Sequence, residues 1–270
     1  MTFQIITADQ RAEMYDKSIA MVLLGPKGAG KTSQLGHLPD DETLFVDLEK
    51  GGRSVVDGEF AFKGDSIQMT SWPELRNLAC VLGGPRAGLS SKQPYSQEHY
   101  DAASKNIDPK MFEKYKYIFV DSVSEVSDIC LKWAQGQCIT KNGDIDKRQA
   151  YGLLGDEIKA FLRQWKHIDG KHVILTCLMC QKTDDKSARY WDVQLDGSQA
   201  MQALVSIFDD VICMIDIPNP KDPQEMIKAF ITREPNPYGV PAKTRSSHLN
   251  AIEEPNTAKL INKIQKKKAK

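Results

Sequence analysis

The stretch Gly25-Pro26-Lys27-Gly28-Ala29-Gly30-Lys31-Thr32 decides how this chain folds, because it matches the pattern G-x-x-x-x-G-K-[ST] of a phosphate-binding loop. It directly follows the apolar run Ala20-Met21-Val22-Leu23-Leu24, which predicts a buried strand. A glycine-rich turn between a strand and a helix points backbone N–H groups toward a bound phosphate, next to the positive end of the helix. The sequence therefore predicts a nucleotide site.

The polar residues of this loop have distinct expected roles. Lys31 is expected to reach the β- and γ-phosphates of ATP, and the Thr32 hydroxyl to bind Mg²⁺. The neighbouring Ser33 completes the predicted ATP-binding set. A flexible glycine turn between packed elements is the plainer alternative. It explains Gly28 and Gly30, but it gives no reason for the lysine and threonine that follow.

The composition is that of an ordinary globular protein. The 270 residues are 41% hydrophobic and 27% charged, and no apolar run approaches the roughly 20 residues of a membrane span. The N-terminal residues lack the basic start and the long apolar stretch of a secretory signal. We therefore expect a cytoplasmic protein with no membrane contact.

The charge balance and the cysteines bear on two other kinds of site, a nucleic-acid surface and a zinc or redox centre. Basic and acidic residues number 36 each, so any contact with nucleic acid has to come from local patches. Lys263–Lys270 is one such patch, although a tail of this kind is more often a solvated chain terminus than a binding element. The six cysteines lie in apolar segments, as is typical of reduced, buried thiols. Cys177 and Cys180 form one C-x-x-C pair, for which strand packing is favoured over zinc or redox chemistry.

Apolar runs alternate with helical patterns along the chain. Besides the first strand, strands are expected at 44–47, 67–69, 117–121, 173–177, 211–215 and 226–231. Helices are expected from the loop through 38, from a capping box at 71–74 to about 83, and at 124–134, 153–165 and 199–208. This order predicts an α/β fold, with a mainly parallel central sheet flanked by helices. The last two strands, separated by a proline-rich turn, predict an antiparallel edge.

A candidate metal ligand ends the strand 117–121. Transfer of a phosphoryl group to water needs a phosphate cradle, a metal ligand and a group that orients the water. Asp121 fits the acid that holds Mg²⁺. Ser122, next to it, is expected to help orient the γ-phosphate. An acid at the end of a strand is common, and it is the loop upstream that makes this one a candidate ligand.

Two segments resemble RecA-type recombinases in order and spacing. Leu44-Phe45-Val46-Asp47-Leu48-Glu49 looks like their strand that ends in the catalytic glutamate, and Tyr117-Ile118-Phe119-Val120-Asp121-Ser122-Val123 looks like their metal-binding strand. In AAA+ proteins the base stands beside the metal-binding acid, where this chain has Ser122. The resemblance therefore makes Glu49 the catalytic base, together with Lys31. The alternative for Glu49 is a solvated acid that starts the turn before Gly51-Gly52.

A longer part of the chain, from about Ser18 to Leu249, resembles the small RecA-like P-loop ATPases of bacteriophages. These are AAA-domain ATP-binding proteins, some of which belong to the Sak group of single-strand annealing proteins. The resemblance implies an ATP- and Mg²⁺-dependent ATPase that acts on single-stranded DNA in phage recombination or replication, by annealing or strand exchange, in the host cytoplasm. A nucleotide-gated binding module with little hydrolysis and, less favoured, a small-molecule kinase stay open as alternatives.

The same resemblance suggests residues that act between subunits. Val240-Pro241-Ala242-Lys243-Thr244-Arg245 is similar to the place where filament-forming recombinases present basic side chains to the ATP of the next subunit. Lys243 and Arg245 would then complete the site in trans, in a ring or a filament. Two solvated charges on a terminal hairpin are the alternative. One position departs from the recombinase pattern, since Thr176 and Cys177 replace a polar sensor that is often Gln.

The DNA-facing loops of the resembled fold correspond to residues 136–149 and 181–198. Their basic candidates are Lys141, Lys147, Arg148, Lys182, Lys186 and Arg189. Tyr190 and Trp191 follow the last of these, and basic residues beside aromatic ones suit a single strand, whose phosphates are neutralised while its bases stack. Both loops also contain aspartates, so ordinary exposed loops remain an alternative. A single-strand binding protein is a further expected partner.

The length allows one large core with appendages. We expect an N-terminal segment over residues 1–17, and a RecA-like ATPase core over 18–250. Residues 83–110, which are rich in Gly, Pro, Ser and charge, are expected to form an insertion in that core. A C-terminal helix and a basic tail are expected over 251–270.

Overall fold

The computed structural model describes residues 5–7, 10, 18–50 and 55–265. Three expectations fall wholly or partly outside these residues. They concern the N-terminal segment 1–17, the Gly51-Gly52 pair and the end of the basic tail, 266–270. Within the described part of the chain, no helix has both the length and the apolar character that a membrane crossing requires.

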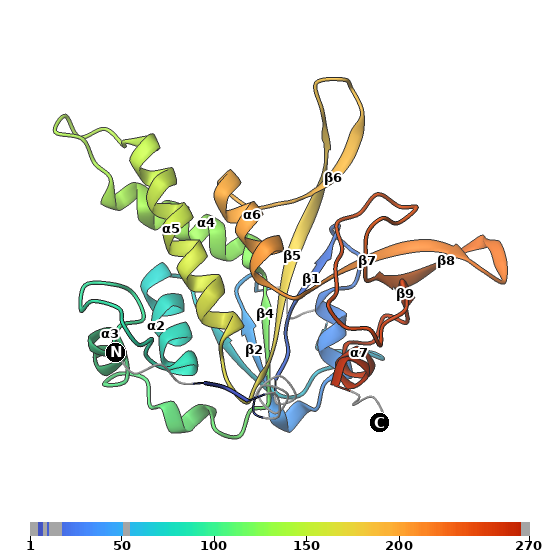
Figure 1. The fold of residues 1–270 in the computed structure, drawn as a ribbon, viewed down its shortest axis with the longest axis horizontal. Coiled ribbons are helices and arrows are strands. Elements are labelled where there is room, and N and C mark those ends of the chain that lie inside the picture. The colour runs from blue at the N-terminus through green and yellow to red at the C-terminus, as the bar shows by residue number, and fades with distance from the viewer. Residues whose placement is uncertain (1–4, 8–9, 11–17, 51–54, 266–270) are drawn as a thin grey trace.

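A sheet of nine strands lies at the centre of the described part of the molecule (Figure 1). Its strands are ordered β3-β2-β4-β5-β1-β7-β8-β9, and β6 pairs with β5 outside this row. The pairs from β3 to β7 are parallel, whereas β7, β8 and β9 pair antiparallel. The predicted class, α/β with a mainly parallel sheet and an antiparallel edge, is confirmed. The bounds are β1 Ala20–Gly25, β2 Thr43–Asp47, β3 Asp65–Gln68, β4 Tyr117–Asp121, β5 His172–Thr183, β6 Arg189–Val193, β7 Asp210–Asn219, β8 Asp222–Ile231 and β9 Ile252–Glu253.

Helices cover both faces of this sheet, and alternate strand residues face each layer. Val22 and Leu24 of β1 pack in one core, whereas Met21 and Leu23 pack in the other. The first core is covered by α2 Trp72–Gly83, α4 Val123–Gln137, α5 Lys147–Lys166 and α6 Ser198–Ile207. The second is covered by the 3₁₀-helix η1 Thr32–His37 and by α7 Thr257–Gln265. Burial on both faces explains why the central strands are continuous apolar runs.

Helix α2 begins at the predicted capping box. The Ser71 hydroxyl accepts a hydrogen bond from the Glu74 N–H at 3.4 Å, and the Glu74 carboxylate accepts one from the Ser71 N–H at 3.2 Å. Pro73 lies in the first turn, where no intrahelical N–H is needed. The helix ends at Gly83, and Gly84 follows with a φ of 69°. Its predicted bounds are therefore confirmed.

Residues 83–110 pack against α2 and α5. They contain α3 Gln97–Ala103, and the 3₁₀-helix η4 Pro109–Phe112 follows. Tyr95 is buried, and the Arg86 Nε donates to Gln164 Oε1 of α5 at 2.7 Å. This segment therefore packs on the outside of α2 and α5 and adds to the helical layer on that face of the sheet.

The segment 181–198, expected to be a loop, is largely a hairpin. Strand β5 continues to Thr183, and Met179–Thr183 pairs antiparallel with Arg189–Val193. We call residues 179–193 the hairpin arm, which extends beyond the body of the molecule (Figure 1). Its turn is closed by Asp184, whose side chain accepts the N–H groups of Lys186 and Ala188 at 2.9 and 2.8 Å. The β-favouring Tyr190 and Trp191 then pair with β5.

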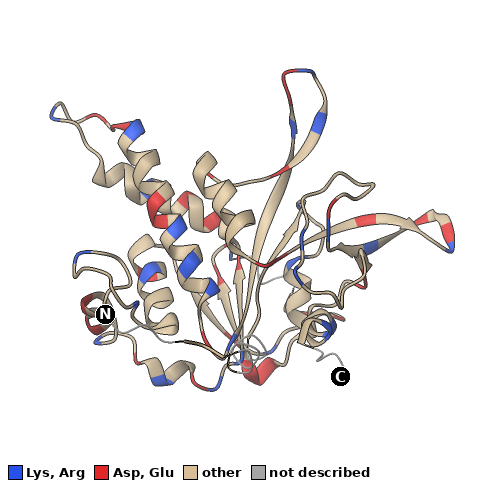
Figure 2. Ribbon diagram, in the orientation of Figure 1, with Lys and Arg blue, Asp and Glu red and all other residues tan. Residues whose placement is uncertain are grey.

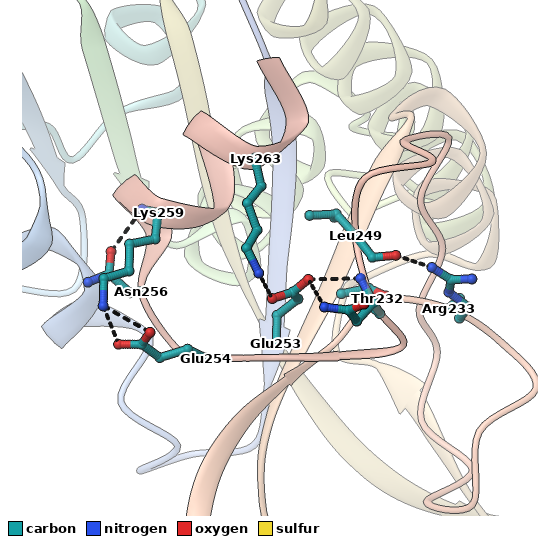
Figure 3. Close-up of polar contacts among 9 residues, drawn as sticks. Thr232, Arg233, Leu249, Glu253, Glu254, Asn256, Lys259 and Lys263 are labelled. Carbon is teal, nitrogen blue, oxygen red and sulfur yellow. Dashed lines mark hydrogen bonds and ion pairs between the residues drawn. The ribbon is translucent and has the colours of Figure 1, made fainter. Parts of the chain in front are cut away.

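Helix α7 is held to the antiparallel edge by an ion pair between its partly exposed Lys263 and the buried Glu253 (Figure 3). Glu253 of β9 is only 7% exposed, and its carboxylate accepts hydrogen bonds from Lys263 Nζ and from the N–H of Asn250. Lys259 and Glu254 form a second pair at 2.7 Å, but both side chains are more than half exposed. The pair at the buried Glu253 carboxylate therefore fixes the last described helix to the sheet.

Candidate functional site

The phosphate-binding loop follows β1 at the carboxyl edge of the sheet. Gly28 and Gly30 have φ values of 79° and 97°, which L side chains rarely adopt. A Cβ on Gly25 would lie 2.8 Å from the Met214 carbonyl oxygen, and one on Gly30 would lie 3.2 Å from Met214 Cε. A Cβ on Gly28 would meet nothing within 4 Å. Strand β7 therefore packs against one side of the loop, and the loop is open at Gly28.

The short helix predicted after the loop is a 3₁₀-helix. It spans six residues, Thr32–His37, and ends before Leu38. The buried Gln34 side chain accepts a hydrogen bond from the Thr257 N–H at 3.1 Å, which ties η1 to α7. Because this helix is short, its aligned peptide dipoles are few. Anion binding here therefore rests on the loop N–H groups and Lys31 more than on a helix dipole.

Lys31 is folded back onto its own loop. Its ammonium donates hydrogen bonds to the carbonyl oxygens of Gly25 and Pro26, both at 3.0 Å, and the residue is 7% exposed. Burial lowers the pKa of Lys31, against the raising effect of nearby Asp121. A phosphate group would replace weak carbonyl acceptors with a charged one, which stabilises the ammonium.

Asp121 is held by two threonine hydroxyls. Thr32 Oγ1 donates to Asp121 Oδ2 at 2.5 Å, and Thr176 Oγ1 donates to Asp121 Oδ1. The residue is 4% exposed, and burial raises the pKa of Asp121. Glu49 raises it further, whereas the two threonines and Lys31 lower it. A cation bound at this carboxylate would offset the cost of burying its charge.

Glu49 faces the same pocket. The Ser122 hydroxyl donates a hydrogen bond to Glu49 Oε1, so the residue expected to orient a phosphate instead orients the predicted base. A pocket of about 260 Å³ is lined by Lys27, Gly28, Gly30, Lys31, Thr32, Ser33, Glu49, Asp121 and Leu178. The structure thus brings together the loop, the predicted metal ligands and the predicted base, which come from β1, β2 and β4.

The residues of this pocket fit a magnesium nucleotide. The Thr32 hydroxyl and the Asp121 carboxylate are hard oxygen donors, which Mg²⁺ prefers. In the described ranges, no cluster of three or more His, Cys, Asp or Glu side chains could hold a metal alone. Mg²⁺ is commonly held by one or two carboxylates together with substrate phosphates and water. The donor set therefore fits a metal ion that is held jointly with phosphates.

Lys243 and Arg245 lie away from this pocket, near the amino-terminal end of β7 and not at the carboxyl ends of the strands. The Lys243 backbone pairs with Val211, near the start of β7. The Arg245 guanidinium, on a side chain 75% exposed, forms an ion pair with Asp209 at 3.0 Å. Because β1 and β7 are parallel and the loop follows the end of β1, these side chains are remote from the loop of their own chain.

Three DNA-binding candidates lie on the hairpin arm. Lys182 and Arg189 belong to its strands, and Lys186 to its turn. The Lys182 ammonium forms an ion pair with Asp192 at 2.7 Å. Lys186 and Arg189 have no carboxylate partner among the described residues. Figure 2 shows both charge signs along the arm. The arm is therefore a mixed-charge projection, not a uniformly basic one.

The other three candidates lie where α4 meets α5. Lys141 is in the exposed connection 138–146, which is closed by a bridge between Ile139 and Ile145. Lys147 and Arg148 belong to the first turn of α5, so placing them in a loop was wrong. The helix extends this far because the Asp146 side chain caps it, accepting the Gln149 N–H at 3.0 Å.

Three residues near the pocket were missed from the sequence. Thr176 was noted only as a departure from the sensor pattern, yet it holds Asp121. Leu178 lines the pocket, and the Lys228 side chain on β8 would lie 3.7 Å from a Cβ on Gly30. Thr176 carried a signal, as a hydroxyl within a buried apolar strand. Leu178 and Lys228 carried none, because strand pairing brings them to the loop.

Comparison with known proteins gave one family and several solved structures. A family model described as an AAA domain matches residues 17–246. Comparison with curated proteins gave no significant match. The chain is similar to the RadB recombinase, with 14% identity and a TM-score of 0.40 over 82% of this chain and 84% of that chain. It is also similar to the flagellar accessory protein FlaH from Methanocaldococcus jannaschii (9% identity, TM-score 0.36, covering 78% of this chain and 75% of that one) and to an ATPase from the type III secretion system of pathogenic bacteria (10%, 0.37, 73% and 51%).

Proposed function

The chain belongs to the AAA domain family, and on this premise we propose that it is a Mg²⁺-dependent ATPase that acts on single-stranded DNA in phage recombination or replication, by annealing or strand exchange. Family membership supports ATPase activity. The observation that carries the proposal is the pocket in which Lys31, Asp121 and Glu49 meet. The DNA substrate rests on the sequence resemblance and on the hairpin arm, whereas the phage role rests on the resemblance alone.

The pocket residues divide the work of hydrolysis. The N–H groups of the glycine loop bind the phosphates, and Lys31 turns from its two carbonyl acceptors to the β- and γ-oxygens. Thr32 and Asp121 would hold Mg²⁺, which when bound would neutralise charge that develops on the phosphates. Glu49 accepts the proton of the attacking water, and its carboxylate is oriented by the Ser122 hydroxyl.

The hairpin arm is the proposed DNA contact. Its strand β5 carries Thr176 at Asp121 and Leu178 at the nucleotide pocket before it enters the arm. Lys186 and Arg189 offer cations for phosphates, and Tyr190, 45% exposed, offers a ring on which a base can stack. The single β-strand β5 therefore links the nucleotide pocket with the proposed DNA surface.

An ATPase assay with and without single-stranded DNA tests this function. The wild-type chain with Mg²⁺ should release phosphate faster when the strand is present, and binding of the strand should weaken as salt is raised. Replacing Lys186 and Arg189 together by alanine should reduce strand affinity and stimulation. Lys221→Ala, at the exposed turn of the β7–β8 hairpin, is the matched control and should change neither. A wild-type chain that does not bind single-stranded DNA would overturn the DNA assignment.

Self-assembly is the second part of the proposal. Lys243 and Arg245 are remote from their own loop, as is required of residues that serve a neighbouring subunit. If they act in trans, ATPase activity rises faster than linearly with protein concentration. Arg245→Ala should then lower activity without unfolding the chain, because its side chain is mostly exposed. Full activity in a monomer would contradict assembly into a ring or a filament.

A further inference from the structure

A second pocket, of about 440 Å³, adjoins the nucleotide pocket across the turn that carries Glu49. It lies at the carboxyl ends of β2 and β3, and its lining comes from the start of α2 and from residues 125–133 of α4. Its volume is within the about 300–1,000 Å³ of ligand sites, and ligands of open α/β sheets bind at this edge. Leu48 and Lys50 line it from one side of the turn, whereas Glu49 lines the nucleotide pocket.

One wall of this second pocket is aromatic and apolar. Trp133 is half-buried and lines the pocket with Ile129 and Met69. The indole is fixed from the protein side, since the Trp72 ring is 6.3 Å from it and the Arg76 guanidinium carbon 5.5 Å from its centroid. An indole packed in this way on a pocket wall offers a face on which a planar nucleobase can stack.

The second pocket also has charged side chains that could bind a nucleotide's phosphate and its base. Lys50 is exposed, and no carboxylate pairs with its ammonium within residues 18–50 and 55–265. The Lys132 ammonium, by contrast, is paired with Asp128 at 2.5 Å. Glu125 lines the same pocket and offers carboxylate oxygens to an exocyclic amino group, such as that of cytosine. With no carboxylate partner among the described residues, Lys50 is placed to bind a phosphate beside a polar and aromatic base site.

We propose that this second pocket receives one nucleotide of a single-stranded DNA, with its base against Trp133 and its phosphate at Lys50. The inference rests on the proposed function, and it adds a binding site separate from the hairpin arm. Both surfaces follow the carboxyl ends of strands of the same sheet.

The occupant would touch the elements that hold Glu49. The Leu48 N–H donates to the Asp121 carbonyl oxygen at 2.9 Å, so the turn is tied to β4. The Ser122 hydroxyl that binds Glu49 also caps α4 by accepting the Glu125 N–H at 3.4 Å. A base held between Leu48 and Glu125 therefore packs against both supports of the predicted catalytic base. Binding of the DNA strand could therefore act directly on the position of the predicted catalytic base.

Equilibrium binding of labelled oligonucleotides to the full chain tests the site. The probes are an oligo(dC) strand and an abasic strand of equal length. Stacking contributes about 1–3 kcal/mol per base, so Trp133→Ala should weaken oligo(dC) binding about 5- to 150-fold and leave abasic binding unchanged. Trp133→Phe keeps an aromatic ring and should lose less. Tyr100→Ala, which removes a half-buried ring from α3, is the matched control.

The outcomes separate this site from the proposed function. If Trp133→Ala binds oligo(dC) as tightly as Tyr100→Ala does, the second pocket does not hold a base, although the arm still can. Lys50→Gln tests the same pocket without touching its apolar wall, and it should weaken binding of both strands. Equal ATPase stimulation by free dCMP and by the strand would overturn the assignment to a polymer. A wild-type chain that binds neither strand would overturn this site and the DNA function together.

Discussion

Replacing Thr176 with valine removes one hydroxyl and keeps the branched shape that a buried strand favours. In the wild-type chain this hydroxyl donates to Asp121, and the two residues are 0% and 4% exposed. Hydrogen bonds to charged groups contribute about 1.5–3 kcal/mol, so the free energy of unfolding should fall by that amount. At about 2–4 °C per kcal/mol, the melting temperature should fall by roughly 3–12 °C.

Thr43→Val is the matched control. Thr43 of the neighbouring strand β2 is also 0% exposed, but among the described residues its hydroxyl has no hydrogen-bond partner. Removing a buried, unsatisfied hydroxyl relieves a desolvation penalty of about 1–3 kcal/mol. This variant should therefore melt at the wild-type temperature or above it. The two substitutions are chemically identical, and what distinguishes their sites is the hydrogen bond to Asp121.

Thermal unfolding without nucleotide, followed by circular dichroism, measures both variants. The same Thr176→Val change is then made in an Asp121→Asn background, where the carboxylate is absent and the loss should shrink. Equal melting temperatures for the Thr176 and Thr43 variants would refute the reasoning. So would an equal loss in both Asp121 backgrounds, because the threonine would then stabilise the chain by other contacts.

Two further predictions concern buried charge. Burial raises the folded-state pKa of Asp121, so the stability contributed by its protonation is fully present below the unfolded value of 3.8 and is lost as the pH rises through the folded value. Asp121→Asn should therefore raise the melting temperature at neutral pH, by an amount that shrinks on acidification; thermal melts over a pH series would contradict this if the gain grew. Lys263→Met leaves the Glu253 carboxylate buried without its ammonium and should destabilise the chain by about 1–3 kcal/mol in urea unfolding. Lys259→Met removes an exposed pair and should change stability by less than about 0.5 kcal/mol, and equal losses would show that burial is not what matters.

The sequence predicted the sheet and the nucleotide pocket because both depend on short segments. A phosphate loop has to follow a strand, and an apolar run that ends in an acid marks a parallel strand and its carboxyl end. Asp121 and Glu49 then meet Lys31 because the parallel strands β1, β2 and β4 end at one edge. These parts of the fold follow from residue type and order alone.

The hairpin arm and the second pocket were not predictable in the same way. The charged side chains of residues 181–198 make this segment resemble a solvated loop. In the structure Lys182 and Asp192 form an ion pair, but only because β5 and β6 pair and bring them together. The second pocket combines residues from three segments between 48 and 133, and no local pattern marks them. Partnerships made by tertiary packing were therefore missed, whereas those fixed by local periodicity were found.

The central claim is that one pocket binds a magnesium nucleotide and that Glu49 activates the attacking water within it. Phosphate release from ATP and Mg²⁺, measured beside nucleotide binding for wild type and Glu49→Gln, tests this most directly. Glu49→Gln should bind ATP as the wild type does and hydrolyse it about 100- to 10,000-fold more slowly, whereas the exposed control Glu113→Gln should do both normally. Normal turnover in Glu49→Gln would contradict the account.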